Sequence, residues 1–407
     1  MKNNLQFNIN LILIIFSALI SSFSFAFSTA ASQRAVSLST LVHFSFGNGA
    51  YPSGKLTLGP NGNYYGMTNN GGNIAFCAPI GCGTFFKVTP SGAITTLEIF
   101  FDMAFGFLPS GGFVLGKDGN FYGSTYGGGD NLDGNIVKMT PAGKVSQVFS
   151  FQGSNGRSPY AGLILAKNGQ FYGVTQQGGT SKNCSSDGCG TLFKITSGGA
   201  FNKLVDFNRR NGAEPSSRLL QLADGSFYGT ATSGGANDKG VIFKLNNLGK
   251  FQVIVNFNGL NGQAPNAGLT LGSDGMLYGT TSQGGSSTLC KGGCGTVFRV
   301  SPSGQLKTLY SFKGKDGREP LAELTLGKDG NFYGSTYKGG TGTKCTDGCG
   351  TIFKMSPSGQ LTTLIHFNQA NGSRPAAEMV FDKDGHLLGT TFLGGRGGAG
   401  TIFRLRL

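Results

Sequence analysis

The residues of this 407-residue chain whose type and spacing best suit chemistry are its cysteines. All eight form close pairs, and each pair ends directly before a Gly-Thr dipeptide. The pairs are Cys77 with Cys82, Cys184 with Cys189, Cys290 with Cys294, and Cys345 with Cys349. In an exported protein, close pairs in even number predict disulfides that clamp short loops. The alternative is zinc shared between neighbouring repeats, but only the last two pairs lie in adjacent repeats, so we predict no metal site.

Positive charge is the second chemical feature, since the formal net charge is +14. One basic position recurs in every repeat: Lys87, Lys138, Lys194, Lys244, Arg299, Lys354 and Arg404. A position present in every repeat is interpreted as part of the fold, with its methylene groups packed along a neighbour and its charge in water. The alternative is a ring of positive charge that holds a polyanion.

A less regular set of cations is predicted to bind a ligand. Three of them stand between repeats and two stand in the cysteine loops: Arg157, Arg318 and Arg374, then Lys182 and Lys344. We expect these five residues to contact a protein or glycan partner, an acidic glycan included. Nucleic acid is not expected as a partner, because the same loops lack aromatic residues on which bases could stack.

Catalytic groups are scarce, and we predict no catalytic residue and no cofactor. His43 and His366 occupy the same place in two repeats, which favours a structural role, and His386 follows a tight turn. No Ser, His and acid grouping suggests a nucleophile with its base. An enzyme that acts on a sugar or lactone stays open as an alternative, and it would require carboxylates from different repeats to converge at the centre.

The strands that position these residues are predicted from a repeated phrase, whose usual form is aromatic-Tyr-Gly-x-Thr. It occurs seven times, with its glycine at 66, 123, 173, 229, 279, 334 and 389. A period of 50 to 57 residues is typical of propellers and solenoids. Each phrase follows an Asn-Gly or Asp-Gly pair, the residues that a two-residue hairpin turn requires. Repeat six shows four strand patterns in order, beginning with residues 321–326 and 331–336.

The two ends of the chain indicate how the repeats are joined. The last repeat ends after its third strand, whereas residues 39–44 match a fourth strand and precede the first repeat. A solenoid would leave both fragments as exposed edges. We therefore predict an all-β fold, a seven-bladed β-propeller of four-stranded antiparallel blades that the N-terminal strand closes by completing the last blade.

Such blades would sort the loops onto two faces. The uniform turns after strands one and three form one face, here called the turn face. The loops between strands two and three, together with the crossings between blades, form the variable-loop face. Function tends to lie on variable loops held by a rigid scaffold. We therefore expect any ligand to bind at the variable-loop face.

The repeated pattern also resembles a known family. Asp-Gly-Asn-Phe-Tyr-Gly-Ser-Thr at 329–336 and Gly-Thr-Ile-Phe-Lys at 350–354 are similar to the GloVer tandem repeat of bacterial secreted proteins. The resemblance covers nearly the whole chain after its first residues and implies export. Family members often end in a surface-anchoring signal, but this sequence ends within a repeat, so the resemblance implies export without anchoring. It supplies no catalytic residues.

The N-terminal residues complete the prediction of domains and location. The apolar run at 11–20 and the small residues near 24–30 indicate a cleaved signal peptide over 1–30, followed by one propeller domain over 31–407. We expect a secreted or periplasmic monomer with no later transmembrane segment. The leading hypothesis is a binding scaffold, and the alternatives are the sugar- or lactone-acting enzyme and a structural protein of the envelope.

Overall fold

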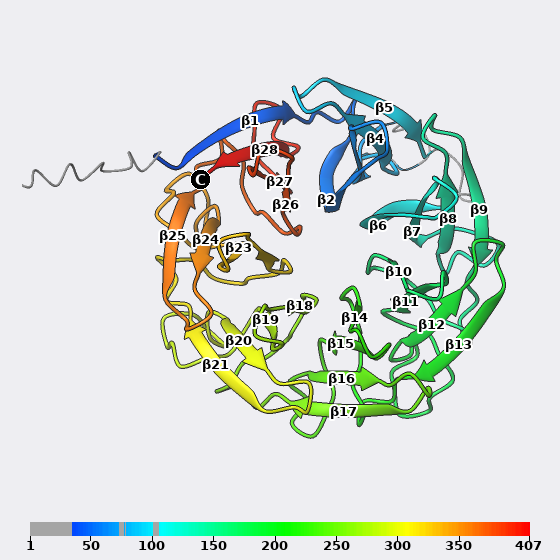
Figure 1. Cartoon of the computed structure of the whole chain (residues 1–407). Coiled ribbons are helices and arrows are strands. Elements are labelled where there is room, and N and C mark those ends of the chain that lie inside the picture. Colours follow the sequence, from blue (N-terminus) through cyan, green and yellow to red (C-terminus); the bar gives the residue numbers. More distant parts are fainter. Residues whose placement is uncertain (1–34, 73–76, 78, 101–105) are drawn as a thin grey trace, which may run out of the picture. The chain divides into compact units, whose positions relative to one another are not determined.

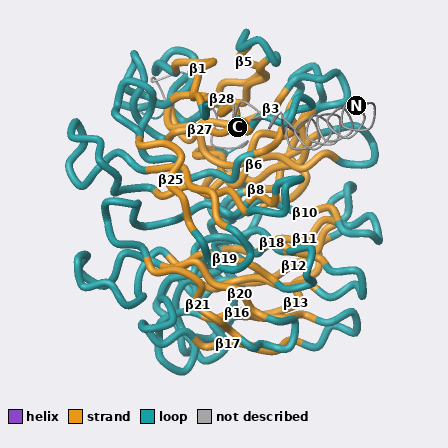
Figure 2. The backbone as a smooth tube through the Cα atoms, turned by 60° about the vertical axis from the view of Figure 1, so that its left-hand side comes forward, coloured by secondary structure: helices purple, strands orange, loops and turns teal. Residues whose placement is uncertain are grey.

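The computed structural model describes residues 35–72, 77, 79–100 and 106–407. Residues 36–407 form one compact unit, and the predicted signal peptide lies outside the described residues. Figure 2 shows strands and loops throughout the described part of the chain, which contains 28 strands and no helix. No helix there is long and apolar enough to cross a membrane. The all-β prediction is confirmed.

The strands follow one another as antiparallel groups of four. The first two groups are β2 (Ala50–Leu58), β3 (Tyr64–Asn70), β4 (Thr84–Val88), β5 (Ile94–Ile99) and β6 (Phe107–Leu115), β7 (Phe121–Gly127), β8 (Asn135–Met139), β9 (Val145–Ser150). They share one eight-stranded sheet, because Lys55 of β2 pairs in parallel with Gly112 of β6.

The remaining groups each form a separate four-stranded sheet. They are β10 (Ile164–Leu165), β11 (Phe171–Thr175), β12 (Thr191–Ile195), β13 (Phe201–Asp206); β14 (Leu220–Gln221), β15 (Phe227–Ala231), β16 (Val241–Leu245), β17 (Phe251–Asn256); β18 (Thr270–Leu271), β19 (Leu277–Thr281), β20 (Thr296–Val300), β21 (Leu306–Ser311); β22 (Thr325–Leu326), β23 (Phe332–Thr336), β24 (Thr351–Met355), β25 (Leu361–His366); and β26 (Val380–Phe381), β27 (Leu387–Thr391), β28 (Thr401–Arg406) with β1 (Ser37–His43).

The groups are arranged around a common centre, which makes the fold propeller-like. Figure 1 shows first strands such as β2, β6 and β14 innermost and fourth strands such as β9, β13 and β17 outermost. The last group takes its fourth strand from the N-terminal side, since β1 pairs with β28 from Ser37 opposite Arg406 to His43 opposite Thr401. The predicted strand composition of the last group is therefore observed.

The innermost strands of five groups are shorter than the sequence pattern predicts. In repeat six the alternating run 321–326 pairs with its neighbour only at Thr325 and Leu326. Pro320 directly precedes this run and has no N–H to donate, and Glu319 before it has a φ of 54°. The run therefore leaves the sheet at its start and lines the centre of the molecule.

The same crossing geometry recurs at the entry to all seven groups, before the innermost strand or, in β2 and β6, at its first residues. The residue before the proline has a φ between 53° and 60° at all seven places, and its N–H donates to a carbonyl of the preceding group. The donors are Tyr51, Leu108, Ser158, Glu214, Ala264, Glu319 and Arg374. The proline covers a glycine of that group; a Cβ at Gly350 would lie 2.7 Å from Cδ of Pro375. This contact explains why Gly precedes Thr in the repeated phrase.

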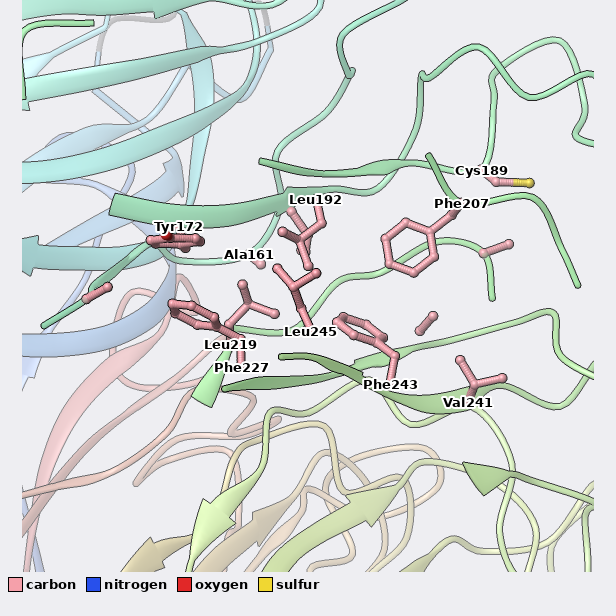
Figure 3. Close-up of a cluster of buried hydrophobic side chains, with 14 residues drawn as sticks. Ala161, Tyr172, Cys189, Leu192, Phe207, Leu219, Phe227, Val241, Phe243 and Leu245 are labelled. Atoms are coloured by element: carbon pink, nitrogen blue, oxygen red, sulfur yellow. The ribbon is translucent and has the colours of Figure 1, made fainter. Parts of the chain in front are cut away.

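The hydrophobic core is divided between neighbouring groups rather than lying within one sheet. Figure 3 shows one such layer, where Tyr172 of β11 lies beside Phe227 of β15. Their ring centroids are 4.2 Å apart. The equivalent pairs Tyr65 with Phe121 and Tyr278 with Phe332 are both 4.1 Å apart. Where a repeat has an aromatic-Tyr dipeptide, the two rings therefore join two groups, with the tyrosine facing one neighbour and the preceding ring facing the other.

Candidate functional site

The predicted disulfides are all present on the variable-loop face. Cys77–Cys82, Cys184–Cys189, Cys290–Cys294 and Cys345–Cys349 are bonded, with Cα atoms 5.1 to 5.5 Å apart. In each pair the second cysteine precedes the glycine that the next crossing proline covers. The bonds therefore fix the loops beside the crossings, as the sequence predicted.

The five predicted ligand-binding cations lie in three of the groups, two of which contribute an arginine and a lysine each. Arg157 forms ion pairs with Asp133 and Asp187, and Arg318 lies 3.1 Å from Asp347. The guanidinium of Arg374 lies over the ring of Tyr337, 5.5 Å from its centroid. Lys182 and Lys344 are exposed and form no ion pair in the described part of the chain. Local carboxylates thus neutralise two of the five, and their role in binding stays a prediction.

The repeated basic position lies opposite the second strand's tyrosine, or opposite Leu388 in the last group. Lys244 pairs in register with Tyr228, and its Nζ lies 5.2 Å from the centre of that ring. Lys354 contacts Tyr333 in the same way and also lies 2.8 Å from Asp329. Burial opposes the ionisation of Asp329, but hydrogen bonds from Lys354, Asn331 and Tyr333 lower its pKa to about 2. These contacts fit the interpretation that the repeated cations belong to the fold.

The histidines make loop-supporting contacts. Nδ1 of His43 accepts a hydrogen bond from the Arg396 N–H, and Nδ1 of His366 accepts one from the Thr341 N–H. Burial lowers the pKa of His43, and the charge of Arg396 lowers it further. His43 and His366 therefore support backbone turns, as their shared position suggested.

One group of metal-type ligands exists among the described residues: Asp382, Asp384 and His386. All three lie in the turn between β26 and β27, where Asp382 accepts the backbone N–H of Asp384 and of His386. Nε of Arg404 also lies 3.3 Å from Asp382. The turn and the guanidinium already account for these carboxylates, so the group does not indicate a metal site.

A different set of residues converges at the centre. The third residue after each crossing proline is Lys55, Gly112, Gly162, Arg218, Gly268, Glu323 or Glu378. Nη2 of Arg218 donates to Glu323 at 3.0 Å and to Glu378 at 2.8 Å, and Lys55 Nζ lies 2.7 Å from Glu378. Four groups thus contribute one ion each to a single cluster, here called the central ion cluster.

The central ion cluster borders two cavities. One, of about 360 Å³, is lined mainly by residues that lead into the innermost strands, such as Ser53, Tyr160 and Asn266, and also by Phe392, which follows β27. These positions adjoin the crossings, so this central cavity lies on the variable-loop side. The other, of about 400 Å³, is lined by the ends of the inner strands on the turn side. Lys55 and Arg218 line both cavities.

Burial determines the electrostatics of this cluster. The side chains of Glu323 and Glu378 keep 14% and 12% of their exposure. Burial raises the pKa of Glu323 to about 7; Arg218 and Lys55 oppose the rise and Glu378 adds to it. The carboxylate of Glu323 in turn raises the pKa of Arg218. One ionisable acid therefore lies beside a permanent cation at the floor of the central cavity.

The sequence reasoning missed this cluster. The alternating pattern of residues 321–326 predicts an ordinary strand, and all five predicted ligand-binding residues lie in loops and crossings. A signal was nevertheless present, because the third residue after each crossing proline differs strongly between repeats whose neighbouring positions agree. The convergence of carboxylates that the enzyme alternative required is observed, although in contact with a guanidinium.

The comparisons with solved structures agree with the fold. The extracellular domain of a proposed hybrid two-component system of B. thetaiotaomicron matches with a TM-score of 0.54 and 15% identity, over 90% of this chain and 40% of that one. This chain therefore spans less than half of that protein. A proposed 6-phosphogluconolactonase of Bacteroides uniformis matches with a TM-score of 0.50 and 15% identity, over 75% and 84% of the two chains. At 15% identity, these matches show only that the folds are similar.

The sequence comparisons bear on the family. No curated protein matches the chain. The family model of the Gloeobacter/Verrucomicrobia repeat matches residues 77–291 and 249–407, which is most of the chain. This is the family that the repeated phrase resembles, and the matched segments contain six of the seven crossing prolines, the cysteine pairs and three members of the central ion cluster. The chain therefore belongs to the Gloeobacter/Verrucomicrobia repeat family.

Proposed function

We propose that residues 31–407 form an exported seven-bladed β-propeller that binds a protein or glycan ligand at its variable-loop face. The central cavity would be the deepest part of the binding site. The observation that carries the proposal is the central ion cluster, which places four charged side chains at the floor of a cavity otherwise lined mainly by small residues. Concave sites with a few convergent polar groups are the usual form of ligand pockets.

Closure by the N-terminal strand is part of this proposal. It is supported by the pairing of β1 with β28 and by the N–H of Tyr51, which donates to the carbonyl of Ala399 at 2.8 Å. The six other crossings make the equivalent bond between neighbouring groups. A Cβ at Gly400 would lie 2.5 Å from Cδ of Pro52, as at the other crossing glycines. The contact between the first and last groups is thus equivalent to the contacts between groups that follow one another in the sequence.

Export is supported by the four disulfides, which persist in oxidising compartments. The apolar N-terminal run at 11–20 supports a signal peptide over 1–30. We propose a monomer that is secreted or periplasmic. N-terminal sequencing of the protein recovered outside the cytoplasm tests the leader, and a first residue near 31 is expected.

The binding proposal is tested with the chain from residue 31 onward on a glycan array and in a pull-down from envelope extracts. Two variants separate the candidate surfaces: Tyr160→Ala at the central cavity, and charge reversal of Arg157, Arg318 and Arg374 on the outer loops. Saturable binding that either variant weakens supports the variable-loop face. Binding that neither changes, or tight envelope association without saturable binding, contradicts it; the latter favours the structural alternative.

Hydrolysis of a sugar or lactone is the second candidate function. The convergence of Glu323 and Glu378 on one guanidinium nitrogen favours it, because such hydrolysis can use two nearby carboxyl groups with different proton affinities. Lactone and glycoside turnover by the wild type, with loss in Glu323→Gln, would support this function. Activity that persists in Glu323→Gln would rule out this pair as its source.

A further inference from the structure

We infer that the central cavity binds a neutral, polyhydroxylated ligand of the size of a sugar ring. This inference rests on the proposed function, which requires only that some ligand binds at the variable-loop face. It goes further by naming the ligand chemistry from the floor and the wall of the cavity.

When Glu323 is ionised, which its raised pKa of about 7 places at slightly alkaline pH, the charges at the floor are matched. Arg218 and Lys55 carry two positive charges, and they lie against the carboxylates of Glu323 and Glu378. An acidic ligand would meet two buried carboxylates, and a basic ligand would meet two cations. Either would have to replace an existing ion pair at a desolvation cost. A neutral ligand can bind without breaking these pairs.

The cluster nevertheless keeps hydrogen-bonding groups unused. Arg218 donates to both carboxylates through Nη2 alone, so Nε and Nη1 have no partner among the described residues. Glu323 accepts through Oε1, and its Oε2 has no partner there either. A hydroxyl group both donates and accepts, so two adjacent hydroxyls match a carboxylate oxygen beside a guanidinium.

Glycine keeps this floor open. A Cβ at Gly268 would lie 2.5 Å from Oε2 of Glu323, so any larger residue would cover the unused oxygen. The equivalent positions 112 and 162 are also glycine, and alanines precede several members of this layer. The charged side chains are therefore reached from a space with small walls.

Aromatic and amide groups stand higher in the same cavity. Tyr160 is 44% exposed, and its hydroxyl has no hydrogen-bond partner among the described residues. Phe392 lines the same cavity and stacks on Tyr51, with ring centroids 4.9 Å apart. The side chain of Gln176 also lines the cavity without a partner in the described structure. Rigid rings offer apolar area for the C–H face of a sugar, while the amide offers a donor and an acceptor.

The test is isothermal titration of the chain from residue 31 onward with glucose, galactose, N-acetylglucosamine, glucuronate and glucosamine. We expect saturable binding of at least one neutral sugar, weakened at least tenfold by Tyr160→Ala. Tyr160→Phe keeps the ring and should retain most of the affinity. Leu248→Ala, at an 88% exposed leucine of the turn between β16 and β17, is the control and should bind as the wild type does.

Each other outcome decides a separate point. Binding of glucuronate or glucosamine without any neutral sugar overturns the neutral-ligand inference and leaves the proposed function standing. Neutral sugars that bind equally to wild type and Tyr160→Ala overturn the cavity as their site. If no sugar in the panel binds while the glycan array or pull-down gives a ligand at the outer loops, the inference fails alone. If both experiments are blank, the proposed function fails with it.

Discussion

Arg218 and Glu378 stand 160 positions apart in the chain, yet Nη2 of the arginine lies 2.8 Å from Oε2 of the glutamate. The contact crosses the centre of the fold, because the two residues stand just before the inner strands β14 and β26 of groups four and seven. It therefore depends on the arrangement of all the intervening sheets. This makes it a sensitive indicator of the architecture.

Arg218→Ala should destabilise the fold, because it leaves Glu323 and Glu378 in a partly buried site without their shared donor. We expect a loss of about 2 to 4 kcal/mol in the free energy of unfolding, since breaking a buried ion pair strands its partner. Urea unfolding followed by tyrosine fluorescence measures it. Arg210→Ala removes an exposed arginine and serves as the control. A loss below about 1 kcal/mol would mean that solvent screens the cluster too strongly for it to stabilise the fold.

Stability should depend on pH through Glu323, whose pKa is raised from 4.5 to about 7 in the folded state. The folded chain then binds a proton that the unfolded chain releases between these values, so stability is highest below pH 4.5 and is lost as pH rises through 7. The contribution is roughly 1 to 3 kcal/mol. Because other groups titrate as well, the comparison is the pH dependence of the wild type minus that of Glu323→Gln. Parallel curves for the two proteins would contradict the raised pKa.

Gly350→Ala should be strongly destabilising. Its φ is 95°, and the new Cβ would lie 2.4 Å from the carbonyl oxygen of Thr336 and 2.7 Å from Cδ of Pro375. We expect a loss of about 3 kcal/mol or more. Gly330→Ala is the control, with a φ of 75° but no atom within 4 Å of the added Cβ, and should cost about 1 kcal/mol. Equal losses would show that the proline contact does not constrain the crossing.

The four disulfides should contribute less to the free energy of unfolding than their number suggests. The Cys345 and Cys349 pair spans four positions, so the chain-entropy model gives at most about 2 kcal/mol for Cys345→Ser with Cys349→Ser. The thermal midpoint should therefore fall by only a few degrees for a domain of this size. Limited proteolysis should instead detect new cleavage in the loop between β23 and β24. Global unfolding of the double variant would show that the bond stabilises more than its loop.

Much of the fold could be predicted because local chemistry repeats. The Asp-Gly and Asn-Gly pairs, such as Asp329 with Gly330, indicate hairpins without any knowledge of the tertiary structure. The cysteine pairs predicted short disulfide-bonded loops for the same reason. The family was also predicted from the repeated phrase, and the match to the Gloeobacter/Verrucomicrobia repeat confirms it.

The central ion cluster could not be predicted in the same way. Its members come from groups one, four, six and seven, and a sequence shows neither how far apart inner strands lie nor which side chains reach across. Glu323 stands in an alternating run that also suits an ordinary strand, and only the crossing before it turns that run toward the centre. The ion pairs of Arg157 and Arg318 could not be predicted either. Their carboxylate partners lie nearby in the structure, but spacing in the sequence does not show which acid pairs with which arginine.

The most direct test of ligand binding at the central cavity is a variant that fills it. Ala376 lines the cavity and is half-buried, so Ala376→Trp should obstruct the route to Arg218 and Glu323. The dissociation constant for the ligand found on the array or in the sugar titrations is measured for Ala376→Trp and for Leu248→Trp, after both are shown to keep the wild-type thermal midpoint. We predict at least a tenfold weaker affinity for Ala376→Trp and an unchanged affinity for Leu248→Trp. Equal affinities for the two variants would contradict binding in the central cavity.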